Sequence, residues 1–204
     1  SKNQYYGEYT FHYWFWKNML NEIEDDSWIG FCAYRRFWSK KNIQKKNSIN
    51  DIALQEVPEE WNDYDTIIGD ELNLIGIPWI KALKYGKISL LKNPKVLLKN
   101  RGNIKFHFDL HHGNGIIEKA ISLLNDNDKN DFKQYINDKT SYNQGNMFIC
   151  RSKKIINEYY QTIFEWLFKC EKIFGFELYG YSKVRMYGFL AERFLPYWFN
   201  KYTK

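Results

Sequence analysis

The sequence predicts a single α/β domain with a small central sheet flanked by helices. Short apolar runs typical of strands alternate with longer segments of helical periodicity, which is the pattern of an α/β fold. The chain has 204 residues, enough for one domain with a substantial core. It contains no internal repeat and no linker long enough to separate two domains. We therefore expect one domain over residues 1–204.

The first expected elements are a helix and two strands. Residues 8–20 contain neither Gly nor Pro and carry aromatic residues at helical spacing, so a helix is expected there. Residues 28–33 form a largely apolar run, rich in aromatics and preceded by a polar turn, which predicts a short buried strand. Residues 64–69 predict a second strand, and its end presents Glu71.

The later segments continue the alternation. The segment 154–174 repeats apolar residues at helical intervals and is followed by a glycine, which predicts a long helix. The other expectations, in chain order, are a basic helical segment at about 72–101, a short strand or extended arm at 104–110, a glycine turn at 113–115, a helix at 116–124, a polar linker at 126–131, a short helix at 132–136, a strand at 146–150, and a last helix or helix pair at 183–199 broken at Pro196.

The cysteines and the hydropathy of the chain predict a cytoplasmic protein. Cys32, Cys150 and Cys170 are odd in number, lie in apolar surroundings and lack metal-ligand spacing, so we expect reduced core residues. No segment approaches the run of about 20 apolar residues that spans a bilayer. The first residues are polar, which argues against a secretory signal. The expected protein is soluble, or peripheral on the inner face of the membrane.

Positive charge is concentrated in residues 81–105. This window holds seven Lys, one Arg and no acidic residue, so it carries +8 while the whole chain carries +6. Leucines interleaved with the lysines predict an interfacial segment on an anionic membrane surface. The alternative is a solvated helix pair whose leucines pack inward. The lysines expected to form the exposed face are Lys81, Lys84, Lys87, Lys92, Lys95 and Lys99.

An arginine pair follows the strand predicted at 28–33. Open α/β sheets bind ligands at the carboxyl ends of their strands, which is where Arg35 and Arg36 would lie. A guanidinium matches a phosphate bidentately and stays charged at any working pH, so the pair suits a diphosphate. Tyr34 adjoins them. The alternative is that one arginine faces solvent while the other pairs with a carboxylate.

Four segments of the chain carry motif-like runs of residues, the first two being 8–18, E-Y-T-F-H-Y-W-F-W-K-N, and 29–36, I-G-F-C-A-Y-R-R. These two runs resemble the E-L-T-x-x-Y-W-x-W-K-N helix and the I-G-L-C-H-Y-R-R strand of a family of bacterial capsular and exopolysaccharide glycosyltransferases. Residues 146–149 resemble its Y-N-M-F-I strand, and residues 187–194 resemble its F-G-F-L-A-E-R-L helix. The four motifs occur in the same order and cover nearly the whole chain.

The resemblance implies a GT-A-like nucleotide-sugar transferase that builds a capsular or surface polysaccharide. Galactofuranose is a donor sugar among similar proteins, and the acceptor is expected to be a polysaccharide or a lipid-linked glycan. The family's His before Tyr-Arg-Arg is Ala33 here, so an imidazole role would be lost or moved to His12, His111 or His112. The chain also starts after the family's N-terminal strand-helix-strand unit, and an incomplete donor site is therefore expected.

Glycosyl transfer from a sugar diphosphate requires charge neutralisation on the leaving group. GT-A enzymes usually supply it with an Asp-x-Asp motif and a divalent metal. The triplet 63–65 precedes its strand and the triplet 126–128 lies in a polar segment, so neither is well placed. We expect no metal and no other cofactor, and predict that Arg35 and Arg36, with His111 and His112, bind the donor diphosphate.

Transfer also requires a base for the acceptor hydroxyl. Asp109 is the first candidate, because it adjoins two histidines at a glycine turn where backbone can approach a ligand. Glu192 and Glu71 are the others, although Glu192 beside Arg193 also suits an internal ion pair. By analogy with the sugar-contacting turn of GT-A enzymes, the expected sugar-binding residues are Asn143, Gly145 and Asn146.

Two other function classes compete with an enzyme. A nucleic-acid binder would interleave aromatic residues with its basic ones, whereas residues 81–105 contain Tyr85 alone, so no nucleic-acid partner is expected. A catalytically silent, membrane-associated scaffold of polysaccharide assembly is the other alternative. Binding of a nucleotide sugar would separate the enzyme from the scaffold.

Overall fold

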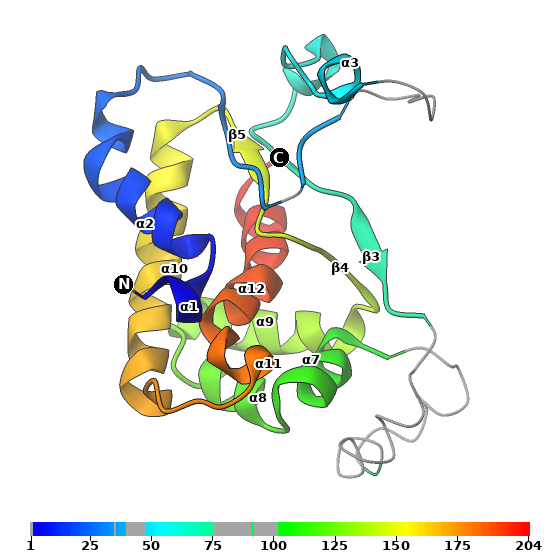
Figure 1. Cartoon of the computed structure of the whole chain (residues 1–204), viewed down its shortest axis with the longest axis vertical. Helices are drawn as coiled ribbons and strands as arrows, with labels where there is room; N and C mark the ends of the chain where they lie inside the picture. Colours follow the sequence, from blue (N-terminus) through cyan, green and yellow to red (C-terminus); the bar gives the residue numbers. More distant parts are fainter. Residues whose placement is uncertain (1, 35, 40–47, 76–90, 92–101) are drawn as a thin grey trace.

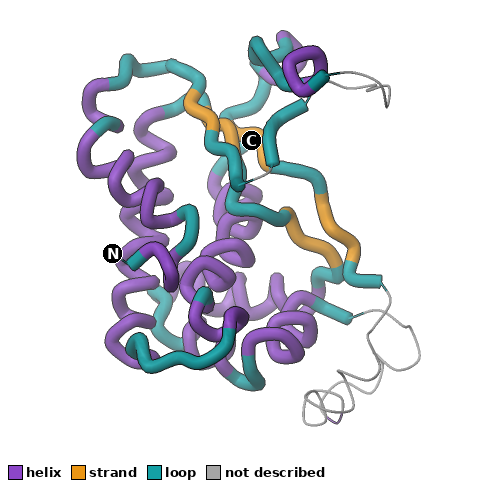
Figure 2. Tube along the Cα trace, viewed as in Figure 1, coloured by secondary structure: helices purple, strands orange, loops and turns teal. Residues whose placement is uncertain are grey.

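The computed structural model describes residues 2–34, 36–39, 48–75, 91 and 102–204. They form a mixed α/β structure in which helices outweigh two small sheets (Figures 1 and 2). Helix α10 (Lys153–Phe174) and helix α12 (Met186–Tyr202) pack against each other, and α2 (Tyr9–Asn18) lies on α10. No helix in the described part of the chain is both long enough and apolar enough to span a bilayer.

The larger sheet joins three short strands in the order β1-β5-β2. The strands are β1 (Ile29–Gly30), β5 (Phe148–Cys150) and β2 (Thr66–Ile68), and both pairings are antiparallel. A bond from the Phe31 amide to the Phe148 carbonyl (2.8 Å) extends the pairing one residue past β1. The strand predicted at 28–33 is therefore confirmed but short. Because its neighbour is antiparallel, the rule for parallel sheets does not explain where the arginines lie.

A second sheet pairs β3 (Glu71–Asn73) with β4 (Ser141–Asn143), again antiparallel. In Figure 1 it lies apart from α10, on the other side of α12. The remaining elements near it are α7 (Ile104–His112), α8 (Ile116–Ile121) and α9 (Asp126–Asp138), which pack on one another. The short helices are α1 (Asn3–Tyr6), α3 (Ile49–Ile52) and α11 (Tyr181–Val184), with two 3₁₀ turns at Leu20–Glu22 and Glu59–Trp61.

The core lies between α10 and α12 and is unusually aromatic. One face of α10 is buried at helical spacing, as the sequence predicts, and α12 is buried on nearly all sides. Each fully buried large apolar side chain contributes roughly 1.5–3 kcal/mol relative to exposure. The indole of Trp166 donates to the Ala120 carbonyl (2.7 Å), which ties α10 to α8. The aromatic residues of the chain are therefore used chiefly for packing.

The prediction of a strand at 104–110 is wrong, because this segment is helix α7. The Asn103 side chain caps the helix by accepting from the Phe106 amide (2.8 Å). The helix is buried on nearly all sides, so it shows no amphipathic period. Its alternating pattern arises because Lys105 and Asp109 form a buried i,i+4 ion pair (2.7 Å) between apolar neighbours.

Three smaller expectations are also corrected. Helix α12 runs through Pro196, which is buried in the core, so packing holds the helix across the missing backbone donor. The polar linker expected at 126–131 is the first part of α9, capped by Asn125. Cys32 is exposed, whereas Cys150 and Cys170 are buried as predicted. Residues 76–90 and 92–101, which hold most of the basic window, lie outside the described residues.

Candidate functional site

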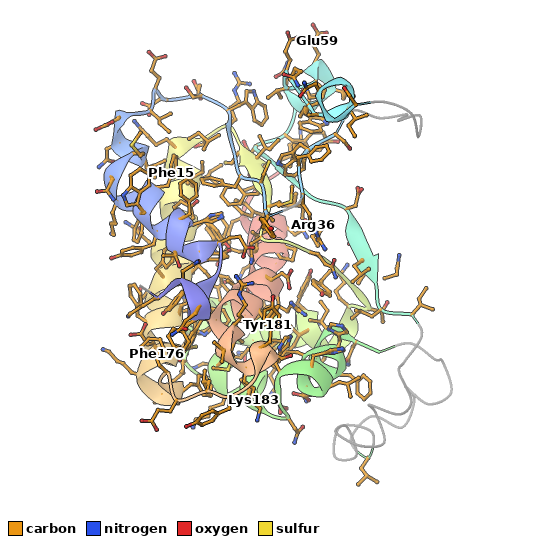
Figure 3. The ribbon with its side chains drawn as sticks, in the orientation of Figure 1. Phe15, Arg36, Glu59, Phe176, Tyr181 and Lys183 are labelled. Carbon is orange, nitrogen blue, oxygen red and sulfur yellow. The ribbon has the colours of Figure 1, made fainter. Side chains whose placement is uncertain are left out.

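A cavity of about 220 Å³ brings together all four segments that carry the family resemblance. In Figure 3, Arg36 lies near the middle of the molecule and Tyr181 lies lower, at the α11 end. The lining residues are Gly7 and Glu8, then Ala33, Tyr34 and Arg36, then Gly145 and Asn146, and finally Tyr181, Arg185, Gly188, Phe189 and Glu192. We call this space the arginine cavity.

Two glycines allow the N-terminus and α12 to approach each other at the arginine cavity. Gly7 has a left-handed φ of 58°, and a Cβ there would lie 2.9 Å from Nη2 of Arg185. A Cβ on Gly188 would lie 3.0 Å from the Tyr6 carbonyl oxygen. The left-handed φ favours glycine at position 7, and the close approach of the Tyr6 carbonyl favours glycine at position 188.

The turn after β4 forms a second wall, against the loop that follows β1. Gly145 has a φ of 92°, and a Cβ there would lie 3.3 Å from Nη1 of Arg36. Arg36 donates through Nη2 to Oε1 of Gln144 (2.8 Å), which fixes the guanidinium beside the turn. Asn146 is also left-handed (φ 54°) and donates to the Gly188 carbonyl (3.4 Å). The turn thus positions a guanidinium and an amide at one cavity.

Glu192 holds this turn from α12. Its Oε1 accepts the Gly145 amide (2.8 Å), and its other oxygen pairs with Arg193. Arg193 is itself buried and lies over the Tyr142 ring, 4.1 Å from the centroid. The internal ion pair weighed from the sequence is therefore present, and Glu192 acts on the site by positioning the turn.

Glu8 and Arg185 line the arginine cavity and were not among the predicted site residues. Burial raises the pKa of Tyr9, and the negative charges of Glu192 and Glu8 raise it further, which places both carboxylates near that phenol. Arg185 donates through Nη1 to the Tyr181 hydroxyl (3.0 Å). Glu8 begins the first motif and Arg185 directly precedes α12, so proximity to the motifs was the available signal.

A second cavity, of about 430 Å³, adjoins the first, and Tyr181 lines both. Asp109 and His111 line this second cavity and not the arginine cavity. Arg36 therefore faces a cavity that neither Asp109 nor His111 lines. We call this second space the tyrosine cavity, because Tyr179 also lines it.

Asp109 is held in a structural role. Its carboxylate is buried, pairs with Lys105 (2.7 Å) and accepts the Gly115 amide (3.1 Å), which closes the predicted glycine turn. A base must reach a substrate proton, and this carboxylate is enclosed by its partners. Glu71 lies on β3, accepts from the Ser141 hydroxyl (2.7 Å) and lines neither cavity.

His111 and His112, predicted to bind the diphosphate, line the second cavity and not the arginine cavity. Burial, with the nearby charge of Arg193, lowers the pKa of His112 to about 3, so its imidazole is neutral at pH 7. It donates through Nδ1 to the Ser182 carbonyl (2.9 Å) and stacks on Phe189. His111 donates through Nδ1 to the His107 carbonyl (2.9 Å) at the C-terminal end of α7, where the helix dipole disfavours an anion.

The other predicted residues divide between the cavity and the framework. Tyr34 lines the arginine cavity with most of its ring exposed, and Gly145 and Asn146 line it as described. Asn143 is buried in β4, where its amide donates to the Gly69 carbonyl, so it fastens the turn before β3. Arg35 lies outside the described residues.

Neither acidic triplet lines the described cavities. Asp128 is buried, accepts from the Tyr197 hydroxyl (2.9 Å) and pairs with Lys201 (3.2 Å). Asp65 accepts the amide of Lys204 (3.1 Å). Among the residues that the structure describes, no three His, Cys, Asp or Glu side chains are grouped so that they could hold a metal ion.

The fold is one found in a glycosyltransferase. The apo structure of the bifunctional glycosyltransferase WbbM matches with a TM-score of 0.63 and 19% sequence identity, over 96% of this chain and 33% of that one. The chain thus spans about a third of WbbM. No curated protein matches. A family described as a domain of unknown function, DUF4422, matches residues 1–203, and the chain belongs to this family.

Proposed function

We propose that this chain is a GT-A-like glycosyltransferase that moves a sugar from a nucleotide-diphosphate donor to a polysaccharide or lipid-linked acceptor. One observation carries the proposal: two guanidiniums and two carboxylates from distant segments line one cavity. The similarity of the fold to part of WbbM supports it, as does the convergence of the four motifs. Galactofuranose and a capsular or other surface polysaccharide are the donor sugar and product that the sequence resemblance favours.

Arg36 and Arg185 would neutralise the departing diphosphate. Guanidiniums bind phosphate oxygens bidentately, and fixed charges in a partly enclosed site act on the transition state without reorganisation. Both arginines are held before any ligand arrives, Arg36 by Gln144 and Arg185 by Tyr181. In this proposal they take the place of the usual metal.

Glu8 would serve as the base, in place of Asp109. The acceptor oxygen attacks the anomeric carbon, the carbon–oxygen bond to the diphosphate breaks, and the acceptor's proton passes to the Glu8 carboxylate. Glu192 would act as a positioning residue, because its oxygens hold the Gly145 amide and Arg193. Tyr34 and Asn146 line the same cavity and would contact the donor.

Calorimetric titration with a panel of UDP-sugars tests this proposal. We expect one UDP-sugar to bind, and binding and transfer to survive excess EDTA because cationic side chains neutralise the diphosphate. Arg36→Ala should weaken this binding. The matched control is Arg151→Ala, which removes an exposed arginine that lines neither cavity and should leave binding unchanged. Transfer that EDTA abolishes and manganese restores would contradict the metal-free site, and binding of no nucleotide sugar would favour the scaffold.

A further inference from the structure

Two largely exposed tyrosines line the tyrosine cavity. Tyr179 is 86% exposed and Tyr181 is 69% exposed, and both rings adjoin a space of about 430 Å³. Two large rings exposed to water do not gain the free energy that burial of aromatic side chains usually provides. Their place beside a cavity indicates a ligand with a flat apolar face.

Tyr181 is held in place before any ligand binds. The Tyr181 hydroxyl accepts from Arg185 (3.0 Å), and the ring lies edge-on to Phe189 with centroids 6.3 Å apart. The next residue, Ser182, accepts at its carbonyl from the buried His112 (2.9 Å), which ties the loop to α7. A preorganised side chain loses little conformational entropy on binding.

The chemistry of the lining matches a sugar ring. A saccharide presents a face of C–H groups, which stacks on a phenol ring, and an edge of hydroxyls, which both donate and accept. Ser182 and Lys183, whose side chains carry a hydroxyl and an ammonium, line the same cavity as the two tyrosines. Figure 3 shows Lys183 below Tyr181 at the α11 end of the molecule.

The position of Tyr181 between the two cavities indicates which substrate a sugar in the tyrosine cavity would be. Because Tyr181 lines both cavities, the two spaces adjoin at this side chain. Group transfer requires the acceptor oxygen within about 3.5 Å of the anomeric carbon, so the two substrates must occupy adjoining sites. We propose that the tyrosine cavity binds the acceptor saccharide, with Tyr179 and Tyr181 as its stacking platform. The acceptor role rests on the proposed function, whereas saccharide binding does not.

Saturation-transfer NMR with free saccharides tests the site without any donor. The probes are the methyl glycosides of glucose, galactose and mannose, with uridine as a nucleoside. We expect at least one glycoside to bind, and Tyr179→Ala and Tyr181→Ala to weaken its binding about tenfold. Tyr64→Ala, at an exposed tyrosine that lines neither cavity, is the matched control and should leave binding unchanged.

The outcomes separate this inference from the proposed function. Arg36→Ala should weaken binding of the nucleotide sugar while leaving glycoside binding intact, since Arg36 lines only the arginine cavity of the two. Tyrosine-dependent glycoside binding in a protein that binds no nucleotide sugar would sustain the saccharide site and refute the donor site. Uridine binding that depends on the tyrosines, or glycoside binding that survives both Tyr→Ala changes, would overturn the inference, as would no glycoside binding at all.

Discussion

Arg36 carries charge at the site without contributing much to the fold. It is exposed, and its bond to Gln144 joins two surface side chains. We expect Arg36→Ala to lower kcat/KM about 100-fold, a loss of roughly 3 kcal/mol of transition-state stabilisation. The free energy of unfolding should change by less than about 0.5 kcal/mol. Steady-state kinetics measures the first effect and urea unfolding the second. A loss of unfolding free energy as large as the loss of transition-state stabilisation would contradict a role of Arg36 in binding the diphosphate.

His112 makes the stability of the protein depend on pH. Its pKa is about 3 in the folded protein, because it is buried, and about 6.5 when unfolded. Below pH 6.5 the unfolded chain therefore binds a proton that the folded chain does not. The stability that the buried, neutral His112 contributes is fully present above pH 6.5 and is lost as the pH falls toward 3.

His112→Phe tests this dependence while keeping a ring against Phe189. Between pH 6.5 and pH 5 the parent should lose about 2 kcal/mol more unfolding free energy than the variant, at about 1.4 kcal/mol for each pH unit. Urea unfolding at the two pH values measures the difference. His12, whose pKa burial also lowers to about 3, remains in both proteins and cancels in the comparison. Identical pH dependence would show that His112 titrates normally.

At the scale of elements, Gly188 sets the distance between α1 and α12. An added Cβ would meet the Tyr6 carbonyl at 3.0 Å, and backbone cannot move aside as a side chain does. We expect Gly188→Ala to lower the unfolding free energy by about 1–3 kcal/mol, although alanine favours a helix. Gly69→Ala is the matched control, because nothing lies within 4 Å of its added Cβ. Equal stability of both variants in thermal unfolding would contradict this packing.

The elements that the sequence predicts well are those with a strong period or a clear boundary. The regular apolar spacing of 154–174 predicts α10 within one residue of its observed start. Helix α7 was mistaken for a strand because burial on nearly all sides erases the period. The buried Lys105–Asp109 pair imitates the alternation of a strand. A charged side chain can be buried when an oppositely charged partner lies beside it, and the spacing of residues in the sequence does not show that the two will pair.

The candidate site was predictable only where motif residues themselves line it. Arg36, predicted from its motif, and Gly145 and Asn146, predicted by analogy with GT-A enzymes, line the arginine cavity. Arg185 was missed because nothing local distinguishes an arginine that faces a cavity from one that faces solvent. Asp109 was the first candidate for the base, but its carboxylate accepts the Gly115 amide in the glycine turn. Such contacts form between distant segments, so they follow from the fold and not from local sequence.

At the scale of the whole molecule, the basic window predicts binding to an anionic membrane surface. Lys105 is buried with Asp109, so it is not part of such a surface. Each exposed lysine contributes about 1 kcal/mol near an anionic surface. The lysines to change to Glu are Lys81, Lys84, Lys87, Lys92, Lys95 and Lys99.

Sedimentation with anionic vesicles compares the parent with that sixfold variant. The parent should bind at low salt and be released at high salt, while the variant stays in the supernatant. Neutral vesicles are the control, and neither protein should sediment with them if charge drives binding. Equal partitioning of the two proteins onto anionic vesicles would mean that residues 81–105 are an ordinary solvated segment.

The walls of the arginine cavity come from segments far apart in the sequence. Glu8 directly precedes α2, and Glu192 lies in α12. Contacts so far apart in sequence form only after the entropy of closing a very long loop has been overcome. The cavity therefore assembles together with the global fold, and no internal fragment of the chain contains it. A single proteolytic cut that lets the N-terminal helices separate from α12 would dismantle the cavity even while the α7–α9 cluster stayed folded.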